Sequence, residues 1–325
     1  MDDPSSFVQH GGGWVTNVGN AFFDLGSMWA VQQAVEGEPS IHLSSSFSRW
    51  TTSKLGRSPS DFLFGRSPDV SNVFDTGSMF DADYVIRAGA HLSKRWFDMH
   101  GEVLREASAN GAKLIFHGVG FSEWAYESDE VAEVKRLLGE LDPYVIISRD
   151  ERTYESLKDV PTHSYNGIDC GFFISDLHDP MPMREEYVAF NFDKTKEPDR
   201  LTLEFSDQMV VRPHHSFWYP WGLRNYPTML SQYYRKKNVF VSDVPREYLD
   251  VYAGATQTHT DRVHAAVATL VFGGKAKLYF DTDRSLLLDR AGAYETENGY
   301  LDLPLSELRS EKDDQIAFLS DVLNE

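Results

Sequence analysis

The chain has 325 residues, 41% of them hydrophobic, with 50 acidic against 31 basic side chains and a formal net charge of −19. That length favours about two domains, and the composition fits packed cores rather than a disordered chain. The negative charge argues against binding to nucleic acid or anionic lipid. It is typical of a protein that works in molar salt, where screening weakens repulsion between acidic groups. The alternative is an ordinary acidic cytosolic enzyme.

The single cysteine, Cys170, excludes an intramolecular disulfide and a cysteine-rich metal site. Its neighbours are largely apolar, so a buried and unreactive thiol is expected. The first residues lack the basic and apolar regions of a signal peptide, and no apolar run approaches the roughly 18–20 residues that a membrane span needs. We therefore expect no membrane span and a cytoplasmic location.

Short apolar segments alternate with longer amphipathic ones, which is the pattern of a parallel α/β fold. In the first half the predicted strands are residues 82–86, 113–117 and 143–148, and the predicted helices are 28–35, 96–109, 129–141 and 151–158. In the second half strands are predicted at 187–192, 209–213, 239–241 and 276–280, and a largely buried helix at 262–272.

The charged, proline-bearing stretch 175–182 interrupts this alternation and marks a domain boundary. The prediction is two Rossmann-like domains, residues 1–178 and 179–325, facing a cleft. Ligands of such sheets lie beyond the carboxyl ends of the strands.

Residues 258–264, Thr-His-Thr-Asp-Arg-Val-His, are expected at a junction between a strand and a helix. Thr260 or Asp261 is predicted to cap the helix, which places Arg262 and His264 in a first turn, where cations oppose the helix dipole. An anionic ligand would explain both residues, since N–H groups, a guanidinium and an imidazole would converge on it. The alternative, of about equal weight, is that Arg262 pairs with a carboxylate and His264 is a satisfied, partly buried histidine.

Two further segments have both a functional and a structural interpretation. Arg149 follows a predicted strand and could point into the cleft, or could form a surface pair with Asp150 that contributes little. Residues 11–27 cluster glycine and asparagine before a helix, which suits close approach of the backbone to a ligand, but also suits a plain loop.

His214 and His215 follow a predicted strand and precede the aromatic residues Phe217, Trp218, Tyr219 and Trp221. Adjacent histidines of an extended chain point in different directions and chelate poorly. No H-E-x-x-H or H-x-x-x-H spacing occurs, so no metal is predicted. The aromatic residues could stack on a sugar ring, although packing in a core is the commoner use.

Taken in chain order, these segments resemble the polysaccharide pyruvyl transferase family. The matching motifs are Asn17-Val18-Gly19-Asn20 through Asp24, Ala82-Asp83-Tyr84-Val85-Ile86 to Gly89, Gly118-Val119-Gly120, Arg149-Asp150 with Thr153 and Leu157, and Asp261-Arg262-Val263-His264 with Ala265, Ala266 and Gly273. The last two, in this order and separation, are the specific part. The chain departs from the family pattern at residues 20–24, at 89–91, where Gly-Ala-His replaces a double glycine, and at Arg284, where lysine is common.

The resemblance implies a fold similar to the GT-B glycosyltransferases and an enzyme that moves the enolpyruvyl unit of phosphoenolpyruvate onto a sugar. Two hydroxyls of the sugar would form a pyruvate ketal, with release of phosphate and without a metal or redox cofactor. Arg149 and Arg262 would hold the phosphate and carboxylate of the donor, since a guanidinium binds both groups in a bidentate way. His264 would be the general acid that protonates the methylene carbon. Asp24 would be the base or an acceptor-binding carboxylate.

The other residues expected to bind substrate are Asn17, Asn20, Gly89, Gly120, Asp169, His214, His215, Asp261, Val263 and Arg284. The acceptor would be a sugar, a nucleotide sugar or a lipid-linked glycan, and any contact with glycan-assembly machinery would be peripheral. Two alternatives keep the fold: a GT-B-type nucleotide-sugar glycosyltransferase, and a non-catalytic glycan-binding relative.

Overall fold

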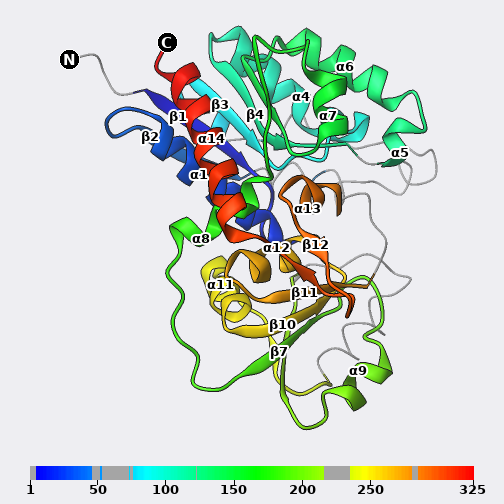
Figure 1. Ribbon diagram of the computed structural model, residues 1–325. Coiled ribbons are helices and arrows are strands. Elements are labelled where there is room, and N and C mark those ends of the chain that lie inside the picture. Colours follow the sequence, from blue (N-terminus) through cyan, green and yellow to red (C-terminus); the bar gives the residue numbers. More distant parts are fainter. Residues whose placement is uncertain are drawn as a thin grey trace. The chain divides into compact units, whose positions relative to one another are not determined.

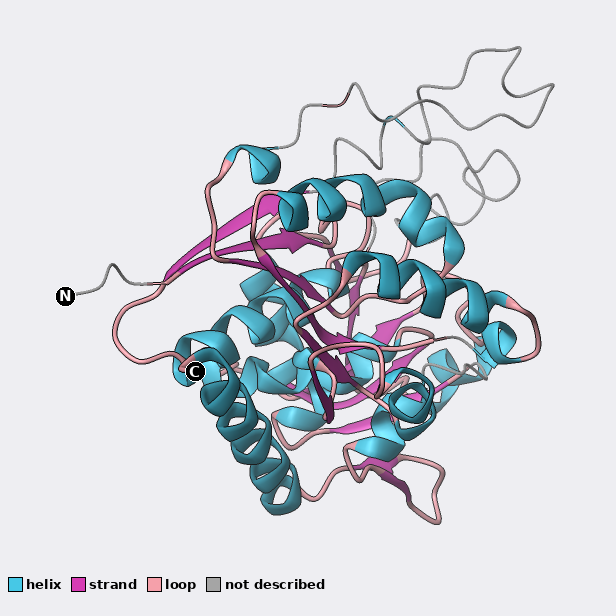
Figure 2. Ribbon diagram, turned by 90° about the horizontal axis from the view of Figure 1, so that it is seen from above, coloured by secondary structure: helices cyan, strands magenta, loops and turns pink. Residues whose placement is uncertain are grey.

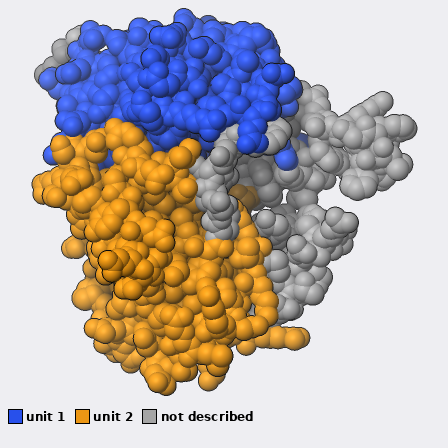
Figure 3. Space-filling model, turned by 45° about the vertical axis from the view of Figure 1, so that its right-hand side comes forward, with its two compact units in different colours: residues 1–13, 27–170, 312–325 blue, residues 14–26, 171–311 orange. Residues whose placement is uncertain are grey.

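The structure is a computed structural model that describes residues 5–45, 52, 73, 76–121, 123–215, 235–279 and 285–325. The chain forms two compact units, which Figure 3 shows in different colours. Unit 1 comprises Met1–Gly13, Ser27–Cys170 and Lys312–Glu325, and unit 2 comprises Trp14–Gly26 and Gly171–Glu311. Compared with the domains predicted as 1–178 and 179–325, three segments differ: residues 14–26 and 171–178 belong to the C-terminal unit, and residues 312–325 belong to the N-terminal one.

Unit 1 is built on a six-stranded parallel sheet in the order β2-β1-β3-β4-β5-β6 (Figure 1). The strands are β1 Ser6–Gly11, β2 Ser40–Ser45, β3 Tyr84–Ala88, β4 Lys113–Val119, β5 Val145–Ser148 and β6 His163–Asn166. The helices that connect them include α1 Gly19–Ala34, α4 Lys94–Ala109, α5 Glu123–Tyr126, α6 Glu130–Leu141 and α7 Glu151–Leu157, with the 3-10 turn η1 Thr76–Met79. Strands β3, β4 and β5 are buried on both faces, apart from Lys113 at the start of β4, as is usual where helices cover a parallel sheet on both sides.

The C-terminal helix α14, Leu305–Leu323, is joined to unit 1 by the buried side chain of Gln315. Its Oε1 accepts a hydrogen bond from the amide of Ile168 at 2.7 Å, and its Nε2 lies 2.9 Å from His117 Nε2. Because the amide nitrogen can only donate, His117 accepts at Nε2 and carries its proton at Nδ1, 2.8 Å from Ser27 Oγ. The last residues of the chain therefore belong with β4 of the N-terminal half.

Unit 2 is built on a seven-stranded mixed sheet in the order β12-β13-β11-β10-β7-β8-β9. The strands are β7 Tyr187–Asn191, β8 Met209–Pro213, β9 Val239–Phe240, β10 Ala255–Thr260, β11 Lys275–Leu278, β12 Tyr294–Glu295 and β13 Leu301–Asp302. From β9 to β11 the pairs are parallel, and only β13 and β12 at one edge are antiparallel. The helices are α8 Ile174–Leu177, α9 Asp199–Glu204, α11 Pro245–Ala253, α12 Val263–Val271 and α13 Leu286–Arg290, preceded by the 3-10 turn η2 Cys170–Phe173.

The predicted strands and helices of both halves are present, with ends that shift by up to two residues, except that the helix predicted from residue 28 begins at Gly19. Figure 2 shows the helices and strands in different colours, with helices packed around the strands. Cys170 is buried, as predicted, and its Sγ contacts the carbonyl of His117. Within the described ranges, no helix combines the length and apolarity needed to cross a membrane.

Candidate functional site

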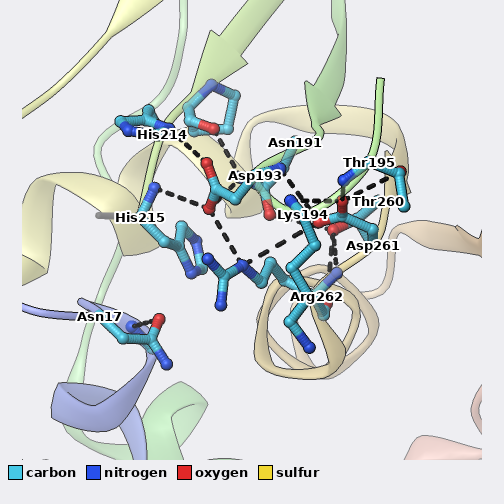
Figure 4. Close-up of polar contacts among 12 residues, drawn as sticks. Asn17, Asn191, Asp193, Lys194, Thr195, His214, His215, Thr260, Asp261 and Arg262 are labelled. Atoms are coloured by element: carbon cyan, nitrogen blue, oxygen red, sulfur yellow. Dashed lines mark hydrogen bonds and ion pairs between the residues drawn. The ribbon is translucent and has the colours of Figure 1, made fainter. Parts of the chain in front are cut away.

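Polar side chains of unit 2 gather at the carboxyl ends of its three central parallel strands. Asn191 ends β7, His214 and His215 follow β8, and Thr260 ends β10 just ahead of Arg262 (Figure 4). The carboxyl edge of a parallel sheet is where α/β proteins bind their ligands. We call this group, with Asp193, Asp261 and His264, the unit 2 cluster.

Helix α12 begins at Val263, with Arg262 as its N-cap residue, so the predicted cap by Thr260 or Asp261 is wrong. Thr260 Oγ1 instead accepts a hydrogen bond from the amide of Arg262 at 2.8 Å and donates to Asn191 Oδ1 at 3.0 Å. These bonds fix the junction to the neighbouring strand β7. Val263 itself is buried in the first turn.

Arg262 is paired with Asp193, whose Oδ2 lies 3.1 Å from the arginine Nε, and lies 4.0 Å from Asp261 Oδ1. The structural alternative for Arg262, pairing with a carboxylate, is therefore observed. Asp193 contacts the Nε of Arg262. A bidentate contact with an anionic ligand would instead use the two terminal nitrogens of the guanidinium, so this ion pair and anion binding are compatible.

Asp193 and Asn191 are the residues of the unit 2 cluster that the sequence did not suggest, and Asp193 is the charged one. Its side chain is fully buried just after β7, and its carboxylate contacts Arg262 Nε, His214 Nδ1 and the amide of His215. Burial raises the pKa of Asp193, and Arg262, His214 and His215 lower it. The lowering is the larger effect, so the pKa lies well below its usual value. The group is therefore a carboxylate at neutral pH.

The carboxylate of Asp261, which was expected to bind substrate, accepts hydrogen bonds from backbone amides instead. Its carboxylate accepts hydrogen bonds from the amides of Asp193, Lys194 and Thr195 at 2.7–3.1 Å, and from Thr195 Oγ1. Three successive N–H groups around one anion form a nest. Asp261 therefore fixes the loop that follows β7, and with it Asp193.

His215 is a buried, neutral histidine. Its Nε2 lies 2.5 Å from the hydroxyl of Tyr252, and burial together with the charge of Arg262 lowers its pKa to about 3, although Asp193 opposes the shift. It cannot act as a cation at neutral pH. His264 is half-buried, and its ring packs on that of Phe23 with 5.3 Å between the centroids.

The segment 14–26 packs against the unit 2 cluster, although it lies at the start of the chain. The amide of Val18 donates to the carbonyl of His215 at 2.9 Å, and a Cβ added to Gly19 would lie 3.2 Å from His264 Cβ. The absence of a side chain at Gly19 therefore favours this close approach of α1 to α12. The start of α1 thus lies beside His215 and His264 of the unit 2 cluster.

Three predicted residues of that segment have partners within it. Asn17 Oδ1 accepts from the amide of Gly19 at 3.3 Å, and its Nδ2 donates to Asn20 Oδ1 at 3.0 Å. Asp24 is fully buried and accepts from Trp14 Nε1 at 2.7 Å. These bonds give all three a part in shaping the loop, and their contact with substrate stays a prediction.

Unit 1 brings together Arg149, Asp169, Gly89 and Gly120 at the carboxyl edge of its own sheet. Arg149 Nη1 lies 2.8 Å from Asp169 Oδ2 and 3.4 Å from the carbonyl of Gly89, and both charged side chains are buried. Asp150 caps α7 by accepting from the amide and hydroxyl of Thr153 at 2.7 and 2.9 Å. The arginine is thus held in a buried ion pair rather than in the surface pair with Asp150.

Gly120 makes room for Arg149, which gives a first prediction. A Cβ at this position would lie 2.8 Å from Arg149 Nε and 2.9 Å from Asp150 Oδ2. We expect Gly120→Ala to lower the free energy of unfolding by about 1–3 kcal/mol, because both neighbours are buried. Gly139→Ala is the control: it lies in α6 with nothing within 4 Å, and should stabilise by up to about 1 kcal/mol. Equal effects of the two changes in urea unfolding would contradict this account.

Some predicted positions lie outside the described residues, namely Arg284 and the aromatic residues at 217–221. Across the part of the chain that is described, no group of three or more histidine, cysteine, aspartate or glutamate side chains is arranged to hold a metal ion.

The family model for polysaccharide pyruvyl transferases matches residues 32–276. The chain belongs to the polysaccharide pyruvyl transferase family, which is a family of transferases. The matched span contains Arg149, Asp193, Arg262 and His264, and it begins after the segment 14–26. No curated protein matches the chain.

Solved structures similar to the chain include two UDP-GlcNAc 2-epimerases and S. aureus MnaA. The enzyme of Neisseria meningitidis bound to UDP-GlcNAc has a TM-score of 0.52 at 11% identity, with 97% of this chain and 94% of that one covered. The enzyme of Methanocaldococcus jannaschii has a TM-score of 0.53 at 8% identity, covering 99% and 98%. S. aureus MnaA with UDP has a TM-score of 0.54 at 10% identity, covering 98% and 91%. At such identities the likeness concerns the fold alone, and it confirms the predicted GT-B-like class of α/β fold.

Proposed function

We propose that the protein transfers the enolpyruvyl group of phosphoenolpyruvate to a sugar of a glycan or glycan precursor, as a ketal. The observation that carries this proposal is the unit 2 cluster, in which Arg262 and His264 lie at the N-terminus of α12 inside the span matched by the family. A helix N-terminus with an arginine suits the phosphate and carboxylate of the donor.

The reaction needs proton transfers and the stabilisation of an anion. A proton added to the methylene carbon creates a cationic C2, which one sugar hydroxyl attacks with loss of its proton. Phosphate then leaves, and the second hydroxyl attacks C2 to close the ketal and loses its proton. In this scheme His264 supplies the first proton, Arg262 holds the departing phosphate, and His215, neutral at physiological pH, serves as a hydrogen-bonding group rather than as an acid.

The proposal is tested by phosphate release from phosphoenolpyruvate, measured with and without a panel of sugars, nucleotide sugars and lipid-linked glycans, in dilute and in molar salt. Release that requires an acceptor, with a pyruvate ketal in the product by mass spectrometry, is the expected result. Binding of UDP-sugars without binding of phosphoenolpyruvate would contradict pyruvyl transfer and would favour a glycosyltransferase activity.

His264 gives a second prediction. His264→Gln keeps a polar side chain but cannot deliver a proton to carbon, so we expect kcat to fall by about 10²–10⁴-fold with little change in KM for phosphoenolpyruvate. His178→Gln is the matched control, because His178 also lies in unit 2 but pairs with Asp250 at 2.8 Å. If His264→Gln retains the kcat of the control, another group is the acid.

A further inference from the structure

Asp193 contacts the nitrogens of Arg262 and His214 that lie nearest the backbone of each residue, Nε and Nδ1. A carboxylate in this position can orient both side chains. Its Oδ2 lies 3.1 Å from Arg262 Nε, and its Oδ1 contacts His214 Nδ1. Figure 4 shows the carboxylate between these two side chains. Because a guanidinium is planar and rigid, fixing Nε also fixes the direction of both terminal nitrogens.

The position of Asp193 is itself fixed from the same junction that carries Arg262. Asp261, the residue before Arg262, binds the amides of residues 193–195. The amide of His215 adds a bond of 3.1 Å to Asp193 Oδ2, and Asn191 Nδ2 adds one of 3.3 Å. The loop after β7, the end of β8 and the start of α12 therefore form one connected hydrogen-bond network.

We propose that Asp193 is a positioning residue of the unit 2 cluster, which orients Arg262 and His214 toward a phosphate-bearing ligand. The identity of that ligand as phosphoenolpyruvate rests on the proposed function. The role differs from simple charge compensation. If Asp193 only neutralised Arg262, its removal would add one positive charge to the site and would tighten the binding of an anion. If Asp193 orients Arg262, its removal weakens binding.

The test is a double-mutant cycle of Asp193→Asn and Arg262→Ala, with phosphoenolpyruvate and inorganic phosphate titrated separately by calorimetry. Contacting residues of one network are coupled, so we expect Asp193→Asn to raise Kd by about 10-fold in the wild-type chain and by less than about 2-fold when Arg262 is already absent. Equal penalties in both backgrounds, or tighter binding by Asp193→Asn, would overturn the proposal.

Glu197→Gln is the matched control, since Glu197 forms another buried carboxylate–arginine pair of unit 2, with Arg212 at 2.9 and 3.0 Å. It should leave both Kd values unchanged, and a shift of equal size would assign the effect of Asp193→Asn to general loosening of unit 2. Thermal unfolding shows whether each variant is folded. Arg262→Gln, whose amide can still donate to Asp193, takes the place of Arg262→Ala if the alanine variant does not fold.

The two ligands separate this proposal from the proposed function. If coupling is seen with inorganic phosphate but phosphoenolpyruvate neither binds nor reacts, the role of Asp193 is supported and phosphoenolpyruvate is contradicted as the donor. If phosphoenolpyruvate is turned over but the effects of the two substitutions on Kd are additive, the donor is supported and the role of Asp193 is contradicted.

Discussion

Replacing Arg149 with alanine is expected to lower the free energy of unfolding by about 3–5 kcal/mol. Arg149 and Asp169 are 5% and 0% exposed, and 2.8 Å separates their charged atoms. Removing the guanidinium leaves Asp169 in the interior without its cation, which is the costly way to break a buried ion pair. Urea unfolding of wild type and variant gives the difference directly.

A second change in the same chain shows where that loss comes from. Arg149→Ala with Asp169→Asn leaves no uncompensated charge, so the double variant should be more stable than Arg149→Ala alone. Lys158→Ala is the control, because the pair of Lys158 and Glu155 is 39% and 53% exposed and should contribute less than about 1 kcal/mol. A loss no larger than that of the control would mean that Asp169 is not held by Arg149.

The same variants test whether Arg149 also binds the donor. If Arg149 or Asp169 contacts substrate, the double variant regains stability without regaining pyruvyl transfer. If the two residues only compensate each other's charge, the double variant regains both. Activity and stability together therefore decide between the functional and the structural interpretation of this ion pair, which the sequence left open.

The sequence predicts those parts of the fold whose signal is apolar periodicity. Strands such as Val145–Ser148 and Tyr187–Asn191 are buried on both faces, so each is a short apolar run. Strand β10 has no such run, because its buried residues include Thr258, His259 and Thr260. These are satisfied instead by hydrogen bonds to Thr269, Tyr279 and Asn191, which no local pattern reveals.

The candidate site was predictable where a residue is unusual for its position. Arg262 and His264 oppose the dipole of the helix they begin, and that signal is local. Asp193 is one of 50 acidic residues, and its importance comes only from burial between β7 and α12. Its position just after a buried strand is the one clue in the sequence. Residues 14–26 pack within unit 2 against segments about 200 residues later in the chain. A single domain boundary at residue 178 could not predict this packing.

Lowering the pH from about 6.5 to about 5 is expected to destabilise the protein through three buried histidines. Burial lowers the pKa of His117 to about 4, that of His215 to about 3 and that of His259 to about 4, against 6.5 for an ordinary histidine. The unfolded chain therefore binds more protons than the folded one throughout this range. The free energy of unfolding is highest above pH 6.5 and decreases as the pH falls. Each histidine contributes up to about 1.4 kcal/mol per pH unit, or about 4 kcal/mol per unit for three.

Measuring urea unfolding at pH 7.5, 6.5, 5.8 and 5.2 at constant salt would give that slope. Asp193 does not account for it: the pKa of Asp193 is also lowered, but its contribution is lost mainly as the pH falls below its unfolded value of 3.8. His117→Gln should remove about one third of the slope, because a glutamine carbonyl can still accept from Gln315 Nε2, as His117 does at 2.9 Å, without taking up a proton. A free energy that stays flat from pH 6.5 to 5.2 would mean that these histidines are protonated in the folded state. An unchanged slope in His117→Gln would remove that residue alone from the account.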